Sequence, residues 1–272
     1  GDELLVEVWG ATEGNFKQKV DAEGNIFLNG VGRIHIAGLS FSEVKAKINS
    51  FLKRIYSGIS APDGSYAKIY TGVTITQVRT VKVNIIGEVM VPGTYSLSSL
   101  STVLNALYAC GGPSESGSFR EISLVRGGKK IANFDIYDFL INGSEKGNLG
   151  LQDQDVIIVP PYKNRVWVEG QVKRKGFYEM LSTETLANLV SFFGGFTSDA
   201  FTNTLVLERI KEAKREVKEI DFSEISKLKM QNGDRLKVHA ITNEYQNRLS
   251  IGGAVYQPGV YEYKEGMTAL DL

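Results

Sequence analysis

The stretch "GEVMVPGTY", Gly87 to Tyr95, occurs three times in the chain with small changes. It returns as "GQVKRKGFY", Gly170 to Tyr178, and as "GAVYQPGVY", Gly253 to Tyr261. The first glycines of successive copies lie 83 residues apart both times. This interval is in the usual size range of a small domain, so the repetition predicts tandem copies of one folding unit.

Each copy has the sequence pattern of a β-hairpin. The residues before the first glycine are rich in β-branched side chains and partly alternate, as in "VKVNIIGEV" at 81–89. A second glycine follows six residues later. Proline favours the second position of a type II turn, and glycine tolerates the positive φ of the third. We therefore predict a strand, a tight turn and a second strand, with the turns centred on Pro92-Gly93, Lys175-Gly176 and Pro258-Gly259.

The remainder of each unit predicts one helix and further strands. In the first copy "STVLNALYACGG" starts with helix-capping residues and ends at Gly111-Gly112, and the second copy ends the same pattern at Gly194-Gly195. "FREISLVRGGKKIANFDI" then indicates a second hairpin, and "LQDQDVIIV" indicates a turn that leads into a last strand. The order of hairpin, helix, hairpin and strand favours an α+β unit in which a mixed sheet wraps one helix, as in the β-grasp arrangement.

The first 80 residues have a different pattern. Strands are predicted at 4–10, on both sides of a turn at 21–24, in "GRIHIAG", and at 67–78. Between them, residues 40–56 predict an amphipathic helix that begins with a capping box of Ser40 and Glu43. The buried stripe predicted for this helix consists of Phe41, Val44, Ile48, Phe51, Leu52 and Ile55.

These patterns predict an α+β protein of tandem small modules. The expected segments are 1–80, 81–163, 164–245 and 246–272, the last being the start of a third, truncated copy. The polar stretches "PYKNR" and "TNEYQNR" are the expected joints. Because the chain opens at "GDELLVEVW" and closes inside a repeat at "TALDL", we expect it to be an excerpt of a longer protein.

Composition excludes several classes of protein. Lys and Arg (31) balance Asp and Glu (31), so no basic excess points to nucleic acid or to an anionic membrane surface. No apolar run approaches the roughly 18–20 residues that cross a bilayer, and no signal peptide is visible. The single cysteine, Cys110, has no internal partner and lies in an apolar helical stretch, which predicts a core position.

The residues that often carry catalysis are scattered. His35 and His239 are the only histidines, and their spacing from each other and from Cys110 is not that of a zinc site. Asp155 and Asp234 occupy the same place in successive copies. A catalytic group is needed once whereas a turn residue is needed in every copy, so we interpret these aspartates, and the nearby Asp153, as structural. We expect no enzyme activity, no metal and no cofactor.

Two further sets of residues allow more than one interpretation. The mixed-charge run at 208–219 favours a solvated hairpin over a docking patch. The aromatic side chains could stack on sugar rings, but their strand and turn positions favour packing roles; they are Trp9, Trp167, Tyr95, Tyr178 and Tyr261. The sequence therefore assigns no ligand-binding residue.

Two motifs resemble those of a known family. "GDELLVEVWG" followed by "VDAEGNIFLNGVGRIHIAGLSFSEVKAKI" is similar to the polysaccharide export domain of outer-membrane exporters of capsule and exopolysaccharide (the Wza type), with Asn29 where that family commonly has proline. The repeated V-x-G-x-V-x-x-P-G-x-Y, with its helix and double glycine, resembles the SLBB (soluble ligand-binding β-grasp) domain. Together the two resemblances cover nearly the whole chain.

The resemblance implies a non-enzymatic periplasmic part of an outer-membrane channel subunit that exports capsular or extracellular polysaccharide. It implies a location at the periplasmic face of the outer membrane, with a lipid anchor in the full-length protein that the internal Cys110 cannot provide. The implied partners are further copies of the chain in a ring, the translocated polysaccharide and an inner-membrane polysaccharide co-polymerase. The alternative is a periplasmic glycan- or protein-binding module without a pore.

Overall fold

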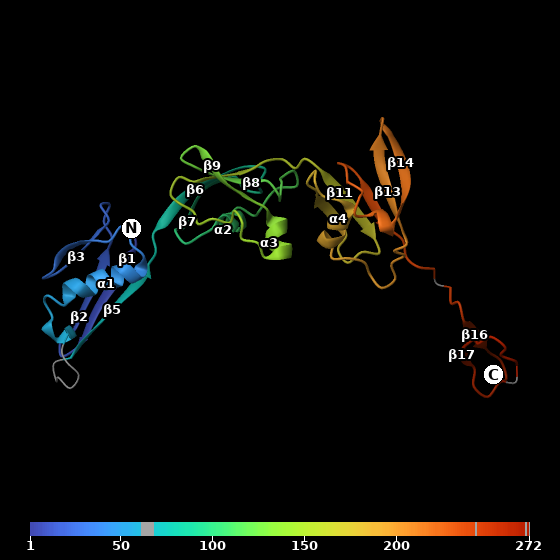
Figure 1. Cartoon of the computed structure of the whole chain (residues 1–272), viewed down its shortest axis with the longest axis horizontal. Coiled ribbons are helices and arrows are strands. Elements are labelled where there is room, and N and C mark those ends of the chain that lie inside the picture. The colour runs from blue at the N-terminus through green and yellow to red at the C-terminus, as the bar shows by residue number, and fades with distance from the viewer. Residues whose placement is uncertain (61–67, 243, 270, 272) are drawn as a thin grey trace. The chain divides into compact units, whose positions relative to one another are not determined.

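A computed structural model describes residues 1–60, 68–242, 244–269 and 271 (Figure 1). The first residue of the strand predicted at 67–78, residue 243 of the second predicted joint, and residues 270 and 272 of the last predicted segment lie outside the described residues. The chain divides into two units, Gly1–Lys163 and Asn164–Leu272, and each is described by itself. The first unit holds an N-terminal domain and module 1; the second holds module 2 and a final hairpin.

The N-terminal domain packs one helix on a small antiparallel sheet. The strands β1 (Glu3–Gly10), β2 (Gly14–Lys19) and β5 (Ile69–Gln77) form the sheet in the order β2-β1-β5. A separate ribbon joins β3 (Asn25–Leu28) to β4 (Gly32–His35), and the 3₁₀ turn η1 (Ser57–Ser60) precedes β5. The helix α1 (Phe41–Leu52) crosses this sheet in Figure 1.

The sequence of α1 accounts for both its start and its buried face. The Ser40 hydroxyl accepts a hydrogen bond from the Glu43 amide, and the Glu43 carboxylate accepts one from the Ser40 amide at 2.7 Å, which confirms the capping box. Val44, Ile48 and Leu52 are buried against the strands. Ile55 was wrongly placed in the buried stripe: the helix ends at Leu52, so Ile55 leaves the helical face and is 45% exposed.

Module 1 is a five-stranded mixed sheet packed on a short helix. Its elements are β6 (Thr80–Gly87), β7 (Gly93–Ser98), α2 (Val103–Ala109), β8 (Ile122–Arg126), β9 (Lys129–Phe134), α3 (Ile136–Asn142) and β10 (Val156–Val159). The strand order is β7-β6-β10-β8-β9, with β6 and β10 parallel. Val103, Ala106 and Leu107 of α2 are buried against the sheet, and Cys110 lies in the same core, as predicted.

Module 2 repeats this topology strand for strand. Its elements are β11 (Arg165–Gly170), β12 (Gly176–Glu179), α4 (Leu186–Phe192), β13 (Thr204–Lys211), β14 (Lys214–Asp221), the 3₁₀ turn η2 (Phe222–Glu224) and β15 (Arg235–Val238). The order is β12-β11-β15-β13-β14, with β11 and β15 parallel. A third hairpin pairs β16 (Arg248–Ile251) with β17 (Gly259–Glu262). The predicted α+β architecture of repeated modules is confirmed.

The predicted hairpins form, but the type II turns do not have the predicted geometry. Gly93 and Gly259 do not have a positive φ; each is the first residue of the second strand. The left-handed residue is instead the glycine that ends the first strand, with φ values of 91° at Gly87 and 90° at Gly170. There the backbone turns directly beside the last residue of the parallel strand, a place where a Cβ would collide with its carbonyl oxygen.

The helix α3 was not predicted. The stretch "FDIYDFLIN" was taken as the end of a hairpin, whereas the second hairpin strand ends at Phe134. Asp135 then caps a new helix by accepting hydrogen bonds from the Tyr137 and Asp138 amides. Module 2 has only the three-residue η2 at the corresponding place. A seven-residue helix has too few turns to give a visible apolar period.

Candidate functional site

Two buried aspartates hold equivalent turns in the two modules. Asp155 accepts hydrogen bonds from Nε and Nη2 of Arg126 at 2.8 and 2.7 Å, and from the Gln152 amide at 2.8 Å. Arg209 binds Asp234 in the same way, at 2.9 and 2.6 Å. The same arginines also donate to a carbonyl of the preceding loop. Because protein donors occupy both carboxylates, the structural role predicted for these aspartates is confirmed.

The repeated tyrosine closes the loop of each hairpin. The hydroxyl groups of Tyr95, Tyr178 and Tyr261 donate to the carbonyl oxygen four residues earlier, at 2.7, 2.8 and 2.7 Å. The rings of Tyr95 and Tyr178 also pack against the module cores, and burial raises the pKa of Tyr178. These contacts give the tyrosines the packing role that their turn position predicted.

The two tryptophans lie in different environments. Trp9 is 47% exposed and stacks on Tyr70 across the β1–β5 pair, with ring centroids 6.0 Å apart. It is therefore a surface residue, and a core role is wrong for it. Trp167 is half-buried on β11, and its ring contacts Phe177 edge-on at 4.7 Å.

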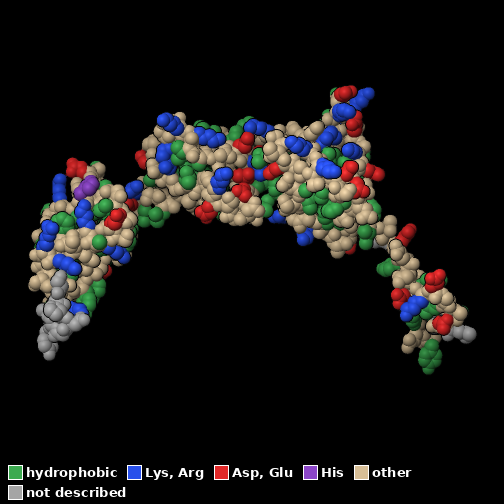
Figure 2. Space-filling view, viewed as in Figure 1, with side chains coloured by type: hydrophobic (Ala, Val, Ile, Leu, Met, Phe, Trp, Pro, Cys, Tyr) green, Lys and Arg blue, Asp and Glu red, His purple; other side chains and the backbone are tan. Residues whose placement is uncertain are grey.

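The mixed-charge run at 208–219 forms most of the β13–β14 hairpin, as predicted. Its turn residues, Glu212 and Ala213, both have positive φ, as a type I′ turn requires. All but one residue of β14 are exposed. Figure 2 shows basic and acidic side chains together on this hairpin, so neither sign dominates there.

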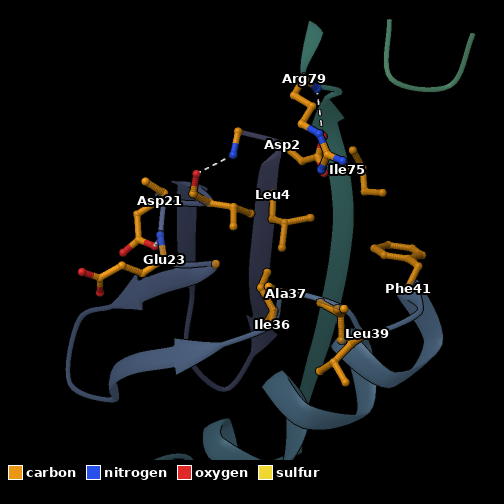
Figure 3. Close-up of a pocket in the computed structure, with 16 residues that line it drawn as sticks. Asp2, Leu4, Asp21, Glu23, Ile36, Ala37, Leu39, Phe41, Ile75 and Arg79 are labelled. Carbon is orange, nitrogen blue, oxygen red and sulfur yellow. Dashed lines mark hydrogen bonds and ion pairs between the residues drawn. The ribbon is translucent and has the colours of Figure 1, made fainter. Parts of the chain in front are cut away.

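A pocket of about 630 Å³ lies in the N-terminal domain. Its apolar side chains come from separate elements in Figure 3: Leu4 from β1, Ile75 from β5 and Phe41 from α1, with Ile36 and Leu39 from the segment before the helix. Leu4 and Ile36 are buried, whereas Leu39 and Ile75 are 36% and 42% exposed. The pocket thus has an apolar floor and an accessible apolar rim, which is typical of a recognition site.

Charged side chains on the rim of this pocket are held by local hydrogen bonds. Asp21 accepts the Asn25 amide at 2.8 Å and the Glu23 amide at 3.0 Å. The bond from Asn25 is the main cause of the lowered pKa of Asp21. Arg79 forms an ion pair with Asp2 at 3.2 Å. A carboxylate with a lowered pKa stays ionised at neutral pH, so Asp21 is unsuited to act as a general acid.

The remaining predicted candidates stay apart. His35 is exposed at the end of β4, with its Nδ1 3.1 Å from the Asn25 side-chain oxygen, and His239 is exposed after β15. Cys110 is buried, and burial raises the pKa of its thiol. Across 1–60, 68–242, 244–269 and 271, no three metal-ligating side chains of the His, Cys, Asp or Glu type come together. No helix in those ranges has the length and apolarity needed to span a bilayer.

Comparison with known proteins matches these parts to two sequence families. Residues 1–62 match the family described as polysaccharide biosynthesis/export protein. Residues 82–134 and 165–219 match the SLBB domain. The chain belongs to the polysaccharide export family. The pocket described above therefore lies in the export domain, and modules 1 and 2 are SLBB modules.

Curated relatives agree with this assignment. Two sequences of the polysialic acid transport protein KpsD of Escherichia coli are 37% and 36% identical to the chain over 176 residues. These alignments cover 63% of the chain and 29% of each relative. The chain therefore spans less than a third of the length of these relatives.

The sequence missed both the export-domain pocket and the arginine partners of the buried aspartates. The pocket residues lie far apart in the chain and meet only in the fold, so no local pattern reveals them. The arginines did leave a signal, because Arg126 and Arg209 are separated by the same 83 residues as the repeated glycines. A charged residue that recurs at the repeat interval together with an opposite charge indicates a buried pair.

Proposed function

We propose that the chain is the periplasmic part of an outer-membrane channel subunit that exports capsular or extracellular polysaccharide. The observation that carries this proposal is the order of domains in one chain: an export domain at 1–62 followed by two SLBB modules. The relatives at 37% and 36% identity are polysialic acid transport proteins, which supports transport of a polysaccharide here too.

We infer that the chain guides a polymer and does not modify it. The two carboxylates that recur in the modules are filled by arginine and amide donors, so neither can reach a substrate in its present state. The acid on the rim of the export-domain pocket has a lowered pKa and is poorly suited to proton donation. These observations support a non-enzymatic role.

The proposal includes a ring of identical chains, supported by an apolar surface on module 1. We name this surface the module 1 tip: Met90 and Val91 on the hairpin loop, and Tyr108 on α2, which are 61%, 59% and 70% exposed. The loop is bonded to the end of α2, because the Met90 amide donates to Gly112 and the Val91 amide to Cys110. Exposed apolar patches commonly mark interaction sites, and in this proposal the neighbouring copy covers the tip.

Module 2 indicates that the fold itself does not require an apolar tip. The residues 83 positions later are Lys173, Arg174 and Ser191. The Lys173 amide donates to Gly195, just as Met90 donates to Gly112, so the loop keeps its geometry with charged side chains. An apolar set at one of two equivalent loops supports a contact made by that module alone.

In this proposal the full-length protein lies at the periplasmic face of the outer membrane and carries a lipid anchor. Its partners are other copies of itself, the translocated polysaccharide and an inner-membrane polysaccharide co-polymerase. A closed ring needs heterologous contacts, and a stable contact buries upwards of about 1,000 Å².

The mass of the full-length protein in mild detergent tests the ring. We expect light scattering to give a single closed oligomer, and cross-linking in intact cells to give a ladder ending at the same size. A protein that remains monomeric in both experiments would favour the alternative function, a glycan- or protein-binding module without a pore.

A further inference from the structure

Module 2 has a pocket of about 250 Å³ on the face of its sheet that points away from α4. Three guanidinium groups and three apolar side chains contribute to its lining: Arg165, Arg215, Arg235, Trp167, Phe177 and Ile210. The strand register brings them together, because Trp167 pairs with Phe177 on one side and with Arg235 on the other. Cations beside exposed rings are the combination that binds an anionic ligand with an apolar face.

The charge of this pocket is positive. Its carboxylate, Asp234, is 1% exposed and is neutralised by Arg209 from the neighbouring strand. Arg215 approaches Glu208 only at 3.8 Å, and both side chains are largely accessible to solvent. In the described part of the chain, no acidic side chain lies within ion-pair distance of the Arg235 guanidinium. An anion that enters the pocket would therefore meet guanidinium groups whose charge is only partly compensated.

The aromatic side of the pocket is held in place before any ligand arrives. The Trp167 indole donates to Glu169 at 3.0 Å and contacts the Phe177 ring edge-on at 4.7 Å between centroids. Arg165 lies 5.5 Å from the centroid of Phe177. Phe177 remains 62% exposed despite these contacts. A ring fixed at its edge and open on much of its surface can receive the C–H face of a sugar at little cost in conformational entropy.

Module 1 indicates that the fold does not require these residues. In its register, Asn84 takes the place of Trp167, Thr94 that of Phe177 and Val156 that of Arg235. Thr94 donates to Asn84 at 2.6 Å, so a simple polar pair fills the same surface. The sheet order is the same in both modules. The aromatic and cationic residues of module 2 are therefore an addition to the common fold, and packing alone does not explain them.

We propose that the module 2 pocket binds a carboxylated sugar unit of the exported polysaccharide. Arginine pairs with a carboxylate through two parallel hydrogen bonds, which Arg235 supplies, while the apolar face of the pyranose packs on Phe177. The inference rests on the proposed function, since it names the class of polymer that the channel carries. It adds a contact point for that polymer on the second SLBB module.

Titration of the full-length protein with three probes tests this site. The probes are galacturonate oligosaccharides, neutral maltooligosaccharides and poly-L-glutamate. We expect the galacturonate oligosaccharides to bind at least about tenfold more tightly than either of the others. Arg235→Gln should weaken their binding by about tenfold, and Trp167→Asn with Phe177→Thr, which copies module 1, should do the same. Lys237→Gln removes an equal charge two residues along β15 and should change binding less than about twofold.

Each other outcome overturns the proposal. Equal binding of poly-L-glutamate, or an unchanged affinity in the aromatic variant, would mean that the pocket attracts charge without recognising a sugar. Absence of binding to galacturonate oligosaccharides by a protein with an unchanged melting temperature would exclude carboxylated sugars. A change of oligomer mass in Arg235→Gln would make the pocket a contact between copies. None of these results affects polysaccharide export itself, which the secretion measurement at the end of the Discussion tests separately.

Discussion

Arg126 grips the buried carboxylate of Asp155 with two nearly parallel hydrogen bonds, of 2.8 Å from Nε and 2.7 Å from Nη2. The side chain of Asp155 is fully buried, whereas that of Arg126 is 28% exposed. Arg209 and Asp234 repeat the arrangement in module 2. The pair joins an inner strand to the turn before the last strand, and it recurs although most neighbouring side chains differ between the modules.

Removing the acid of this pair should destabilise module 1 strongly. Asp155→Ala leaves a guanidinium and the Gln152 amide without their acceptor, and breaking a buried pair in this way costs about 3–5 kcal/mol. Denaturant unfolding of the chain measures the change. Asp153→Ala is the matched control, since this exposed acid in the same turn accepts a single bond from the Lys82 amide and its loss should cost about 1 kcal/mol. Equal effects of the two substitutions would contradict the role given to the pair.

The glycine that ends the first strand of each hairpin should not tolerate a side chain. Gly170 has a φ of 90°, and a Cβ there would collide with the Val238 carbonyl oxygen. We expect Gly170→Ala to lower the free energy of unfolding by more than about 1 kcal/mol. Gly93→Ala is the control, because Gly93 has no positive φ and its added Cβ would meet its nearest neighbour, a ring carbon of Tyr95, at 4.0 Å. Loss of stability in the control alone would restore the type II turn that the sequence predicted.

The sequence was informative where the chemistry is local or repeated. Ser40 and Glu43 identify the start of α1, because the capping box needs only residues three positions apart. The double glycine at 111–112 identifies the end of α2, since both residues have the left-handed φ that glycine accepts readily. The equal spacing of Gly87 and Gly170 predicted one fold in two copies, and their common backbone geometry confirms it.

The sequence was uninformative where the outcome depends on distant partners. Pro92-Gly93 fits a type II turn locally, but pairing with β6 draws Gly93 into a strand. Trp9 has the alternation of a core strand residue, yet it lies on the sheet face that α1 does not cover. The pocket of module 2 became visible only when Phe177 was compared with Thr94 in the same register. Departures from a repeat identified it, whereas the repeat itself identified the fold.

The capping box of α1 should make the export domain sensitive to acid. The hydrogen bond from the Ser40 hydroxyl is the main cause of the lowered pKa of Glu43, whose ordinary value is 4.5. A carboxylate with a depressed pKa contributes stability above its ordinary pKa, and the contribution is lost as pH falls through its folded value. Glu43→Gln should therefore lower the melting temperature at neutral pH, and the difference from the wild type should shrink below pH 4.5. Glu13→Gln, at an exposed strand-flanking site, serves as the control; a pH-independent difference for Glu43→Gln would contradict the assignment.

Exchange of the module 1 tip for its module 2 counterpart should weaken assembly. The variant carries Met90→Lys, Val91→Arg and Tyr108→Ser, which replaces apolar contact area by charges that module 2 already accommodates. We expect the full-length variant to dissociate in detergent at concentrations where the wild type remains a ring, with an unchanged melting temperature of the modules. The control is Leu140→Ser, which changes another exposed apolar residue of module 1, on α3. An intact ring in the tip variant would exclude the tip from the contact between copies.

The most direct test of polysaccharide export is the location of the polymer in cells that lack the protein. Cells with the gene deleted are fractionated, and the polysaccharide on the surface and in the medium is compared with that retained inside the envelope. The account predicts that the polymer is still made but accumulates inside the outer membrane, and that the full-length gene restores its release. Normal amounts of surface polysaccharide in the deletion strain would contradict the account.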